Sequence, residues 1–262
     1  MAGNGRSGDR RSVAEKVFAI AEAFDGPGGG RLSLTEIAAR ADLPLSTAHR
    51  LVDEWMTWGG LAREEDGRYT LSMKLWRLGV RAPTARKLRA LALPFLEDLY
   101  EVTRQNVHLA VLDNGEALYL EHLTGAKSVK VISEPGTRLP LHATGVGLVL
   151  LAYAPESALA DVLAAGPKKY LPNTLTTERE LRKRLAEVRS NQLAVSVNEM
   201  TPDSFSAAAP VRDQTGSVIA AVSVVAHAAR QADPQVVLAV RLAALGISRA
   251  HGWQPGARGR AS

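Results

Sequence analysis

The stretch DLPLSTAHRLV, residues 42–52, lies between two short helical patterns near the N-terminus. Ala48, Leu51 and Val52 recur at the spacing of one buried helix face. The pattern predicts the turn and second helix of a helix-turn-helix. In that motif the second helix presents the side chains at its N-terminal end to bases in the major groove of DNA. Four side chains that can donate hydrogen bonds are left to point outward: Ser46, Thr47, His49 and Arg50.

A capping box precedes this stretch. In Ser33-Leu34-Thr35-Glu36 the Ser33 hydroxyl and the Glu36 carboxylate can each satisfy an unpaired amide, which predicts a short helix over residues 34–41. Thr35 stands near the start of that helix. We therefore expect Thr35 to help fix a DNA phosphate.

A hairpin is predicted directly after the second helix, which should run from residue 45 to 58. Two short strand-like runs within residues 61–71 flank Asp66-Gly67, a dipeptide that favours a tight turn. A hairpin in this place is a wing, so residues 12–72 read as a winged helix-turn-helix. Arg68, near the tip, is expected to reach a phosphate or the minor groove.

Charge is concentrated in the same part of the chain. The net charge is +5, and residues 1–90 hold 15 Lys and Arg against 11 Asp and Glu. Residues 1–11 are rich in Gly, Ser and Arg without an apolar period, which predicts a disordered basic tail. A basic head on a nearly neutral body is typical of a protein that binds a polyanion.

Length and composition limit the other classes. The 262 residues, 46% of them hydrophobic, are enough for two domains that each bury a core. No apolar run approaches the ~18 residues that cross a bilayer, and residues 1–9 lack the apolar core of a signal peptide. A cytoplasmic protein is expected. The absence of Cys excludes disulfides, cysteine nucleophiles and thiolate metal sites.

Residues 73–90 are predicted to form a linker helix between head and body. A short helical pattern over 73–80 is interrupted at Ala82-Pro83, and a longer one starts at Thr84. Pro94 falls within the longer pattern and should kink or split it. The apolar face of this segment is expected to dock on the body or on another subunit.

The body is predicted to begin with a β-hairpin around Asn114-Gly115, a strong hairpin signal. A two-residue loop there places His108 opposite Glu121 and Val107 opposite His122. On this register His108 and His122 face opposite sides of the hairpin and cannot share a metal ion, so we expect no metal site. A third strand is predicted over residues 128–132.

The rest of the body is predicted to contain both helices and strands. Helices are predicted over 145–152, over 156–164, after a capping box at Thr177, and from Asp233-Pro234 to the C-terminal end of the body. Strands are predicted over 193–197, 206–211 and 217–225. Together with the hairpin this order describes an α+β sandwich.

Taken together, these stretches resemble the IclR family of bacterial transcriptional regulators over roughly residues 12–250. The head motifs that carry the resemblance are Ser12-Val13, Leu34-Thr35-Glu36-Ile37-Ala38, Leu43-Pro44, Ser46-Thr47-Ala48-His49-Arg50-Leu51 and Asp66-Gly67-Arg68-Tyr69. The body motifs are Leu109-Ala110-Val111-Leu112-Asp113, Arg138-Leu139-Pro140-Leu141-His142-Ala143-Thr144 and Ala208-Ala209-Pro210-Val211-Arg212-Asp213.

The resemblance implies an α+β protein that regulates transcription by binding operator DNA under control of a small molecule. A winged helix-turn-helix is joined by a linker helix to a GAF-like effector-binding domain, here residues 91–252, with a flexible tail over 253–262. Family members form dimers that often pair into tetramers. Their effectors are commonly small organic or aromatic acids, and no cofactor is implied.

Carried onto this chain, the family's effector loop falls on Leu141–Val146. Amides around Thr144, Gly145 and Val146 at a helix start suit a carboxylate, because this end of a helix carries partial positive charge. His142, within the loop, either contacts the effector or packs in the loop.

The strand contributions depart from the family pattern. An acidic residue and a Cys are replaced by Ser196 and Ser206, a pair of serines becomes Ser223 and Val225, and a Lys becomes Leu148. We expect the site to persist with Ser196, Ser206 and Ser223 in it. The departures favour a ligand that is larger or less polar than glyoxylate or pyruvate.

Two other classes of protein fit parts of the pattern. An architectural DNA-binding protein would keep the head and carry an inert body. An enzyme fused to a DNA-binding head is disfavoured because no Gly-x-Ser-x-Gly nucleophile elbow occurs.

Overall fold

The computed structural model describes residues 11–25, 28–79, 81, 83–125, 128–230 and 233–254. It divides the chain into two compact units, Met1–Pro83 and Thr84–Ser262. The predicted N-terminal tail, except Arg11, and most of the predicted C-terminal tail lie outside the described residues.

The first unit is a winged helix-turn-helix. Its elements are α1 (Val13–Glu22), α2 (Leu34–Arg40), α3 (Leu45–Trp58), β1 (Leu61–Arg63), β2 (Tyr69–Leu71) and α4 (Met73–Gly79). Capping boxes form at Ser12 and Ser33, and α3 ends at Gly59, whose φ of 79° suits glycine. The core gathers apolar side chains of α1, α2, α3 and the hairpin, among them Ile20, Ile37, Leu51, Leu61 and Tyr69.

The wing contains a third short strand segment. β1 and β2 pair antiparallel with Leu61 opposite Leu71, and Leu32 exchanges both backbone hydrogen bonds with Tyr69, at 3.0 and 2.7 Å. Gly67 has a φ of 81°, and the backbone of Glu64 pairs with that of Arg68. The predicted hairpin is confirmed, with a three-residue loop of Glu65, Asp66 and Gly67.

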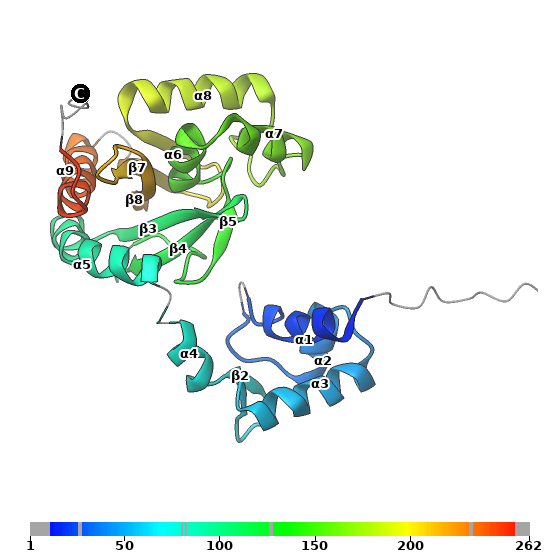
Figure 1. The fold of residues 1–262 in the computed structure, drawn as a ribbon. Helices are drawn as coiled ribbons and strands as arrows, with labels where there is room; N and C mark the ends of the chain where they lie inside the picture. Colours follow the sequence, from blue (N-terminus) through cyan, green and yellow to red (C-terminus); the bar gives the residue numbers. More distant parts are fainter. Residues whose placement is uncertain are drawn as a thin grey trace, which may run out of the picture. The chain divides into compact units, whose positions relative to one another are not determined.

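The second unit is built on a six-stranded antiparallel sheet with the order β5-β4-β3-β8-β7-β6 (Figure 1). The strands are β3 (Asn106–Asp113), β4 (Glu116–Leu123), β5 (Arg138–Pro140), β6 (Ala194–Val197), β7 (Ser204–Arg212) and β8 (Val218–His227). A short 3-10 turn, Ala228–Arg230, follows β8. Because β3 and β8 pair in the middle, the first hairpin and the C-terminal strands share one sheet.

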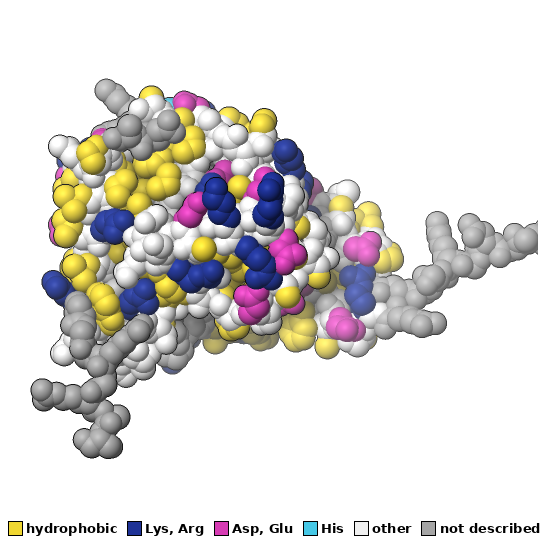
Figure 2. All heavy atoms as spheres, turned by 90° about the horizontal axis from the view of Figure 1, so that it is seen from above, with side chains coloured by type: hydrophobic (Ala, Val, Ile, Leu, Met, Phe, Trp, Pro, Cys, Tyr) yellow, Lys and Arg dark blue, Asp and Glu magenta, His cyan; other side chains and the backbone are white. Residues whose placement is uncertain are grey.

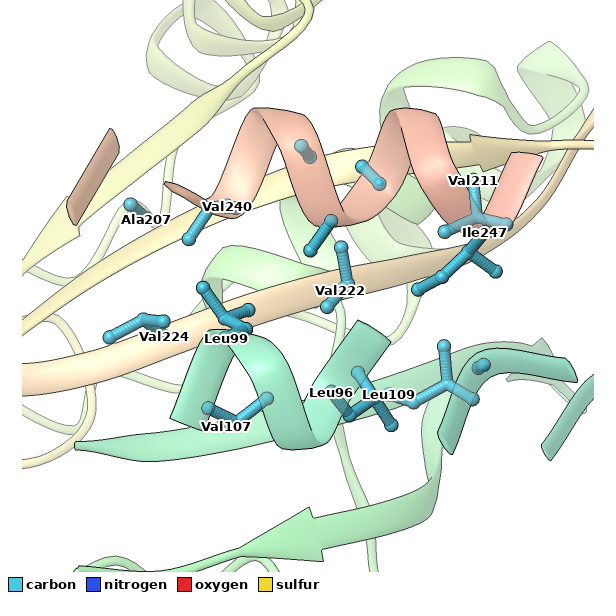
Figure 3. Close-up of a cluster of buried hydrophobic side chains, with 14 of the residues drawn as sticks. Leu96, Leu99, Val107, Leu109, Ala207, Val211, Val222, Val224, Val240 and Ile247 are labelled. Carbon is cyan, nitrogen blue, oxygen red and sulfur yellow. The ribbon is translucent and has the colours of Figure 1, made fainter. Parts of the chain in front are cut away.

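Helices cover both faces of this sheet, as the α+β prediction requires. On one face α5 (Pro83–Thr103) and α9 (Pro234–Ala250) bury Leu96, Leu99, Val240 and Ile247 against β3, β7 and β8 (Figure 3). The other face is covered by α6 (Gly145–Tyr153), α7 (Glu156–Ala164) and α8 (Glu178–Asn191). Each fully buried leucine or valine contributes about 1.5–3 kcal/mol of burial free energy, so helix packing on both faces stabilises the sheet.

The predicted register of the β3–β4 hairpin is wrong beyond its tip. Asp113 pairs with Glu116, but the register shifts between Leu109 and Ala110, so His108 lies opposite His122. The extra residue is Leu120. It packs into the α5–α9 core beside Glu121, which pairs with Arg89 of α5. A bulge places two successive residues on the helix side, which turn chemistry alone does not predict.

Two further predictions need correction. Residues 128–137 form no strand; Arg138–Pro140 pairs with β4 instead, while the Asn106 side chain holds the backbone of Val129. The expected split at Pro94 does not occur, because α5 continues through it to Thr103.

None of the helices within the described ranges is long and apolar enough to span a membrane.

Candidate functional site

The front of α3 presents the polar side chains that the sequence singled out. Ser46, His49 and Arg50 are exposed and Thr47 is half-buried, while Ala48, Leu51 and Val52 enter the core. Thr35 is exposed near the start of α2.

Two of these side chains pair with carboxylates one turn later on the same helix. His49 Nδ1 lies 3.1 Å from Asp53 Oδ2, and Arg50 Nη1 lies 2.7 Å from Glu54 Oε1. All four side chains are more than half exposed, so these pairs contribute little to stability. The sequence reasoning missed both partners, although their i, i+4 spacing was visible.

Arg68 ties the wing to α2. Its Nη1 lies 3.1 Å from Glu36 Oε2 and donates to the Arg31 carbonyl at 3.3 Å. Backbone and side-chain hydrogen bonds from Ser33, with Arg68 nearby, lower the pKa of Glu36. Arg68 is therefore already engaged within the unit.

A small cavity lies in the second unit between the sheet, the start of α6 and the coil before β5. Its volume is about 40 Å³. Six of the predicted effector residues line it: Thr144, Gly145, Val146, Ser196, Ser206 and Ser223. These six residues come from four separate segments, and Ser206 and Ser196 stand opposite each other in the β6–β7 pairing.

The N-terminus of α6 opens onto this cavity. Thr144 Oγ1 donates to the Pro140 carbonyl at 3.1 Å and accepts from Gly147 N at 3.1 Å, so it caps the helix. Within the described residues, the Gly145 and Val146 amides have no hydrogen-bond partner. Their N–H groups and the helix dipole make this end attractive to an anion.

Gly145 is needed for the approach of α6 to the sheet. A methyl group on Gly145 would overlap the Ser206 hydroxyl and press on the Ser206 Cβ. The Ser206 hydroxyl therefore lies directly beside the helix N-terminus.

His108 forms another polar wall of the cavity and was not predicted to do so. Its Nε2 lies 2.7 Å from Ser133 Oγ, and its Nδ1 lies 3.5 Å from Ser223 Oγ. The Tyr119 ring meets it edge-on at 5.3 Å. Burial, with the nearby His122 as a second cause, lowers the pKa of His108 well below its ordinary value. The register error hid this residue, because it paired His108 with Glu121.

The coil over residues 128–137 closes the cavity. Val131, Ile132 and Ser133 line it. Besides the Ser133 contact, the coil is held by Asn106, which donates to the Val129 carbonyl at 2.7 Å and accepts from Ser128 Oγ at 3.0 Å.

His142 does not line this cavity. Its Nε2 lies 2.9 Å from the Lys168 carbonyl oxygen and its ring is tilted against Tyr170. Of the two expectations for His142, loop packing describes its position in the structure.

Larger hollows lie elsewhere in the unit but suit a small ligand less well. A cleft of about 810 Å³ runs along α8 and β6, where Glu180, Arg184 and Glu187 contribute charges of both signs. Figure 2 looks down onto α8 and shows Lys and Arg side chains beside Asp and Glu. Mixed charge on an open surface is ordinary for a solvated helix.

His108 and His122 stack on one face of the hairpin, contrary to the predicted orientation. Over the ranges that the structure describes, no three His, Asp or Glu side chains gather as metal ligands.

Comparison with known families explains why a winged head and this body occur together. The model "IclR helix-turn-helix domain" matches residues 13–65, and "Bacterial transcriptional regulator IclR C-terminal" matches residues 81–249. The chain belongs to the IclR family. It is therefore a transcriptional regulator with a DNA-binding head and an effector-binding body.

Curated IclR-family relatives agree along most of their length. The chain is 31% identical over 227 residues to the HTH-type transcriptional regulator XynR of Escherichia coli, covering 85% of this chain and 90% of the relative. It is also 31% identical over 228 residues to the glycerol operon regulatory protein of Streptomyces coelicolor, covering 85% and 89%. Both relatives are regulatory proteins.

Solved IclR-family structures share the fold. An IclR homolog from Microbacterium hydrocarbonoxydans, complexed with 4-hydroxybenzoate, is 34% identical with a TM-score of 0.83, covering 91% of this chain and 98% of the homolog. The Thermotoga maritima IclR is 27% identical with a TM-score of 0.70, covering 92% and 98%.

Proposed function

We propose that this regulator senses a small carboxylic acid in the cavity beneath residues 128–137. The observation that carries the proposal is the pair of unpartnered amides at Gly145 and Val146 beside the Ser206 hydroxyl. Three donors at a helix N-terminus form a carboxylate site whose charge needs no cationic side chain.

The acid is larger and less polar than a two- or three-carbon keto acid. Apolar side chains make up much of the cavity wall, including Val131, Leu139, Met200 and Val225. The relative crystallised with an aromatic acid supports the same class. A cavity of about 40 Å³ holds a few waters, so the coil must move outward to admit a ring.

The acid acts through α5, which begins where the two units divide. Leu96 and Leu99 pack on the sheet, and Arg89 Nε lies 2.6 Å from Glu121 Oε2 on β4. His108 and His122 stand on the opposite face of the same two strands. A ligand that shifts β3 and β4 therefore changes how α5 packs on them. The ligand controls DNA affinity by favouring one of two conformations.

DNA contact is assigned to Ser46, Thr47, His49 and Arg50 on α3, with Thr35 and Arg68 on phosphates. A cytoplasmic location is proposed with this role, because operator DNA lies in the bacterial cytoplasm. To contact DNA, His49 must leave the Asp53 carboxylate and Arg50 must leave the Glu54 carboxylate.

A second copy of the chain is proposed to cover the apolar face of the first unit. None of the described side chains of α4 is buried, and Met73, Trp76 and Leu78 are 67%, 59% and 54% exposed. Two heads joined in this way match a pseudo-palindromic operator.

Pairing of dimers into a tetramer has a candidate surface on the second unit. A groove of about 430 Å³ between α5 and α9 is lined by Val102, Leu238 and Leu242, all more than half exposed. Figure 2 shows hydrophobic side chains gathered toward the α9 side.

Trp76→Gln should dissociate dimers in sedimentation velocity, whereas Leu242→Lys should leave dimers and remove only the tetramer. Monodisperse wild-type monomer contradicts both interfaces.

A gel-shift titration of the full chain on the DNA flanking its own gene tests the sensor. A panel of aliphatic and aromatic carboxylic acids should change the affinity, and Ser206→Trp, which fills the cavity, should abolish the response. Ser190→Trp on the exposed face of α8 is the matched control. Sequence-indifferent binding that no acid alters supports an architectural protein instead.

A further inference from the structure

His108 marks an end of the cavity away from the N-terminus of α6. Gly145 approaches β7 at Ser206, whereas His108 lies on β3. Strand β8 separates the two, and neighbouring strands lie about 4.8 Å apart, so roughly 10 Å separate the two polar ends. One ring that carries polar groups on opposite sides, with a hydrogen bond at each, spans this length.

The polar groups at this end are buried and neutral. His108 is 1% exposed, Ser133 3% and Ser223 1%. A neutral imidazole carries one N–H donor and one acceptor nitrogen. It therefore suits a hydroxyl group, which both donates and accepts, better than a second carboxylate, which only accepts.

The surface between the two ends is apolar. Leu139, Val146 and Val225 line the cavity together with the Tyr119 ring. The Tyr119 hydroxyl is protonated at neutral pH, and burial raises its pKa further above the ordinary value. A planar apolar body between two polar ends fits these walls better than a chain of hydroxyl groups.

We propose that His108 is a specificity-determining residue that binds a hydroxyl group on the side of the effector opposite its carboxylate. This proposal rests on the function proposed above and narrows the effector to a hydroxylated ring acid. The ligand hydroxyl takes the place of Ser133 Oγ on His108, so recognition and release of the coil over residues 128–137 are one exchange of hydrogen bonds.

The exchange leaves the coil attached at its other end. Asn106 keeps Ser128 and Val129 on β3 while Ser133 moves away. An acid ring that lacks the hydroxyl moves Ser133 away without offering a hydrogen bond in return, so His108 Nε2 is left without a partner. Leaving a buried polar group unpaired disfavours that acid.

Isothermal titration of the full-length protein with benzoate, 4-hydroxybenzoate and pyruvate tests this role. Wild type should bind 4-hydroxybenzoate about tenfold more tightly than benzoate. His108→Phe keeps the ring but removes both nitrogens, and should bring the two affinities within about twofold. His108→Gln, which restores a donor and an acceptor, should recover part of the preference. His227→Gln removes an imidazole that is exposed at the end of β8 and should behave as wild type.

The outcomes separate this inference from the proposed function. Equal wild-type affinity for the two aromatic acids, or binding of pyruvate alone, overturns the role of His108 while the sensor stands. A preference that survives in His108→Phe also overturns it. Binding of no acid contradicts the carboxylate sensor itself. If His108→Phe fails to fold by circular dichroism, the comparison of wild type with His108→Gln decides.

Discussion

His108 and His122 stack on neighbouring strands with their ring centroids 4.6 Å apart and their planes 28° apart. The β-bulge at Leu109/Ala110 brings them together. Both rings face the side of the sheet that holds the cavity, where His108 contacts Ser133 and His122 contacts Asn106.

Protonation of this pair should destabilise the body. Burial lowers the pKa of both histidines, and for His108 the neighbouring His122 lowers it further. The unfolded chain then binds protons more readily, so the stability is fully present above pH 6.5, the ordinary value, and falls as the pH drops below it. Urea unfolding from pH 7.5 to 5 should show a steeper fall in wild type than in His122→Gln. The difference should be at most about 1.4 kcal/mol per pH unit per proton. His227→Gln should not flatten the profile.

Glu54 should restrain DNA binding. Because Glu54 holds Arg50 at 2.7 Å, Glu54→Ala releases the guanidinium and removes a negative charge near the phosphates. We expect a several-fold gain in operator affinity for Glu54→Ala and a loss of about 1–3 kcal/mol for Arg50→Ala in fluorescence anisotropy. Arg182→Ala on α8 is the control. Equal affinity of all three variants would remove α3 from the DNA interface.

Gly145→Ala should disturb both packing and ligand binding. The added methyl group meets the Ser206 hydroxyl, so we expect a loss of about 1–3 kcal/mol in unfolding free energy. Ser206→Ala added to this variant should recover part of the loss. Carboxylate binding should remain weak in the double variant, since one donor is gone. Gly30→Ala, whose methyl group meets nothing within 4 Å, should be neutral. A stable, fully binding Gly145→Ala variant would contradict the tight approach of α6 to β7.

Glu199 should make stability fall as the pH rises. It is 3% exposed, its Oε1 lies 2.9 Å from Arg184, and its Oε2 has no partner among the described residues. Burial raises its pKa, against the opposing effect of Arg184. The folded state then keeps a proton that the unfolded state loses. The unfolding free energy therefore decreases as the pH rises from 4.5, the ordinary pKa, through the raised pKa of the folded state. Glu199→Gln should remove this decrease in chemical denaturation between pH 4.5 and 7, whereas Glu116→Gln, an exposed carboxylate on β4, should keep it.

Local chemistry predicted most of the elements. Capping boxes at Ser12, Ser33 and Thr177 set helix starts, because a hydroxyl and a carboxylate three residues apart satisfy amides within one turn. Asn114-Gly115 and Asp66-Gly67 placed both hairpins for a similar reason, since Gly115 and Gly67 adopt positive φ. Motif order identified the family, and with it the two functional halves of the chain.

Long-range packing decided the rest. The bulge at Leu109/Ala110 exists because Leu120 and Glu121 both turn toward α5, and no local pattern encodes a demand from a helix elsewhere in the chain. Residues 128–132 look like a strand in isolation, but the Asn106 side-chain amide donates to the Val129 carbonyl, a backbone group that a ladder would use.

The sequence alone therefore determined most of the secondary structure, the family and the serines and amides around Gly145, since these depend on short-range spacing and recognisable motifs. Tertiary structure alone decided that His108 enters the cavity and His142 leaves it. A shift of one residue in register reverses which side of a sheet a side chain faces, and only the assembled sheet with its helices sets that register.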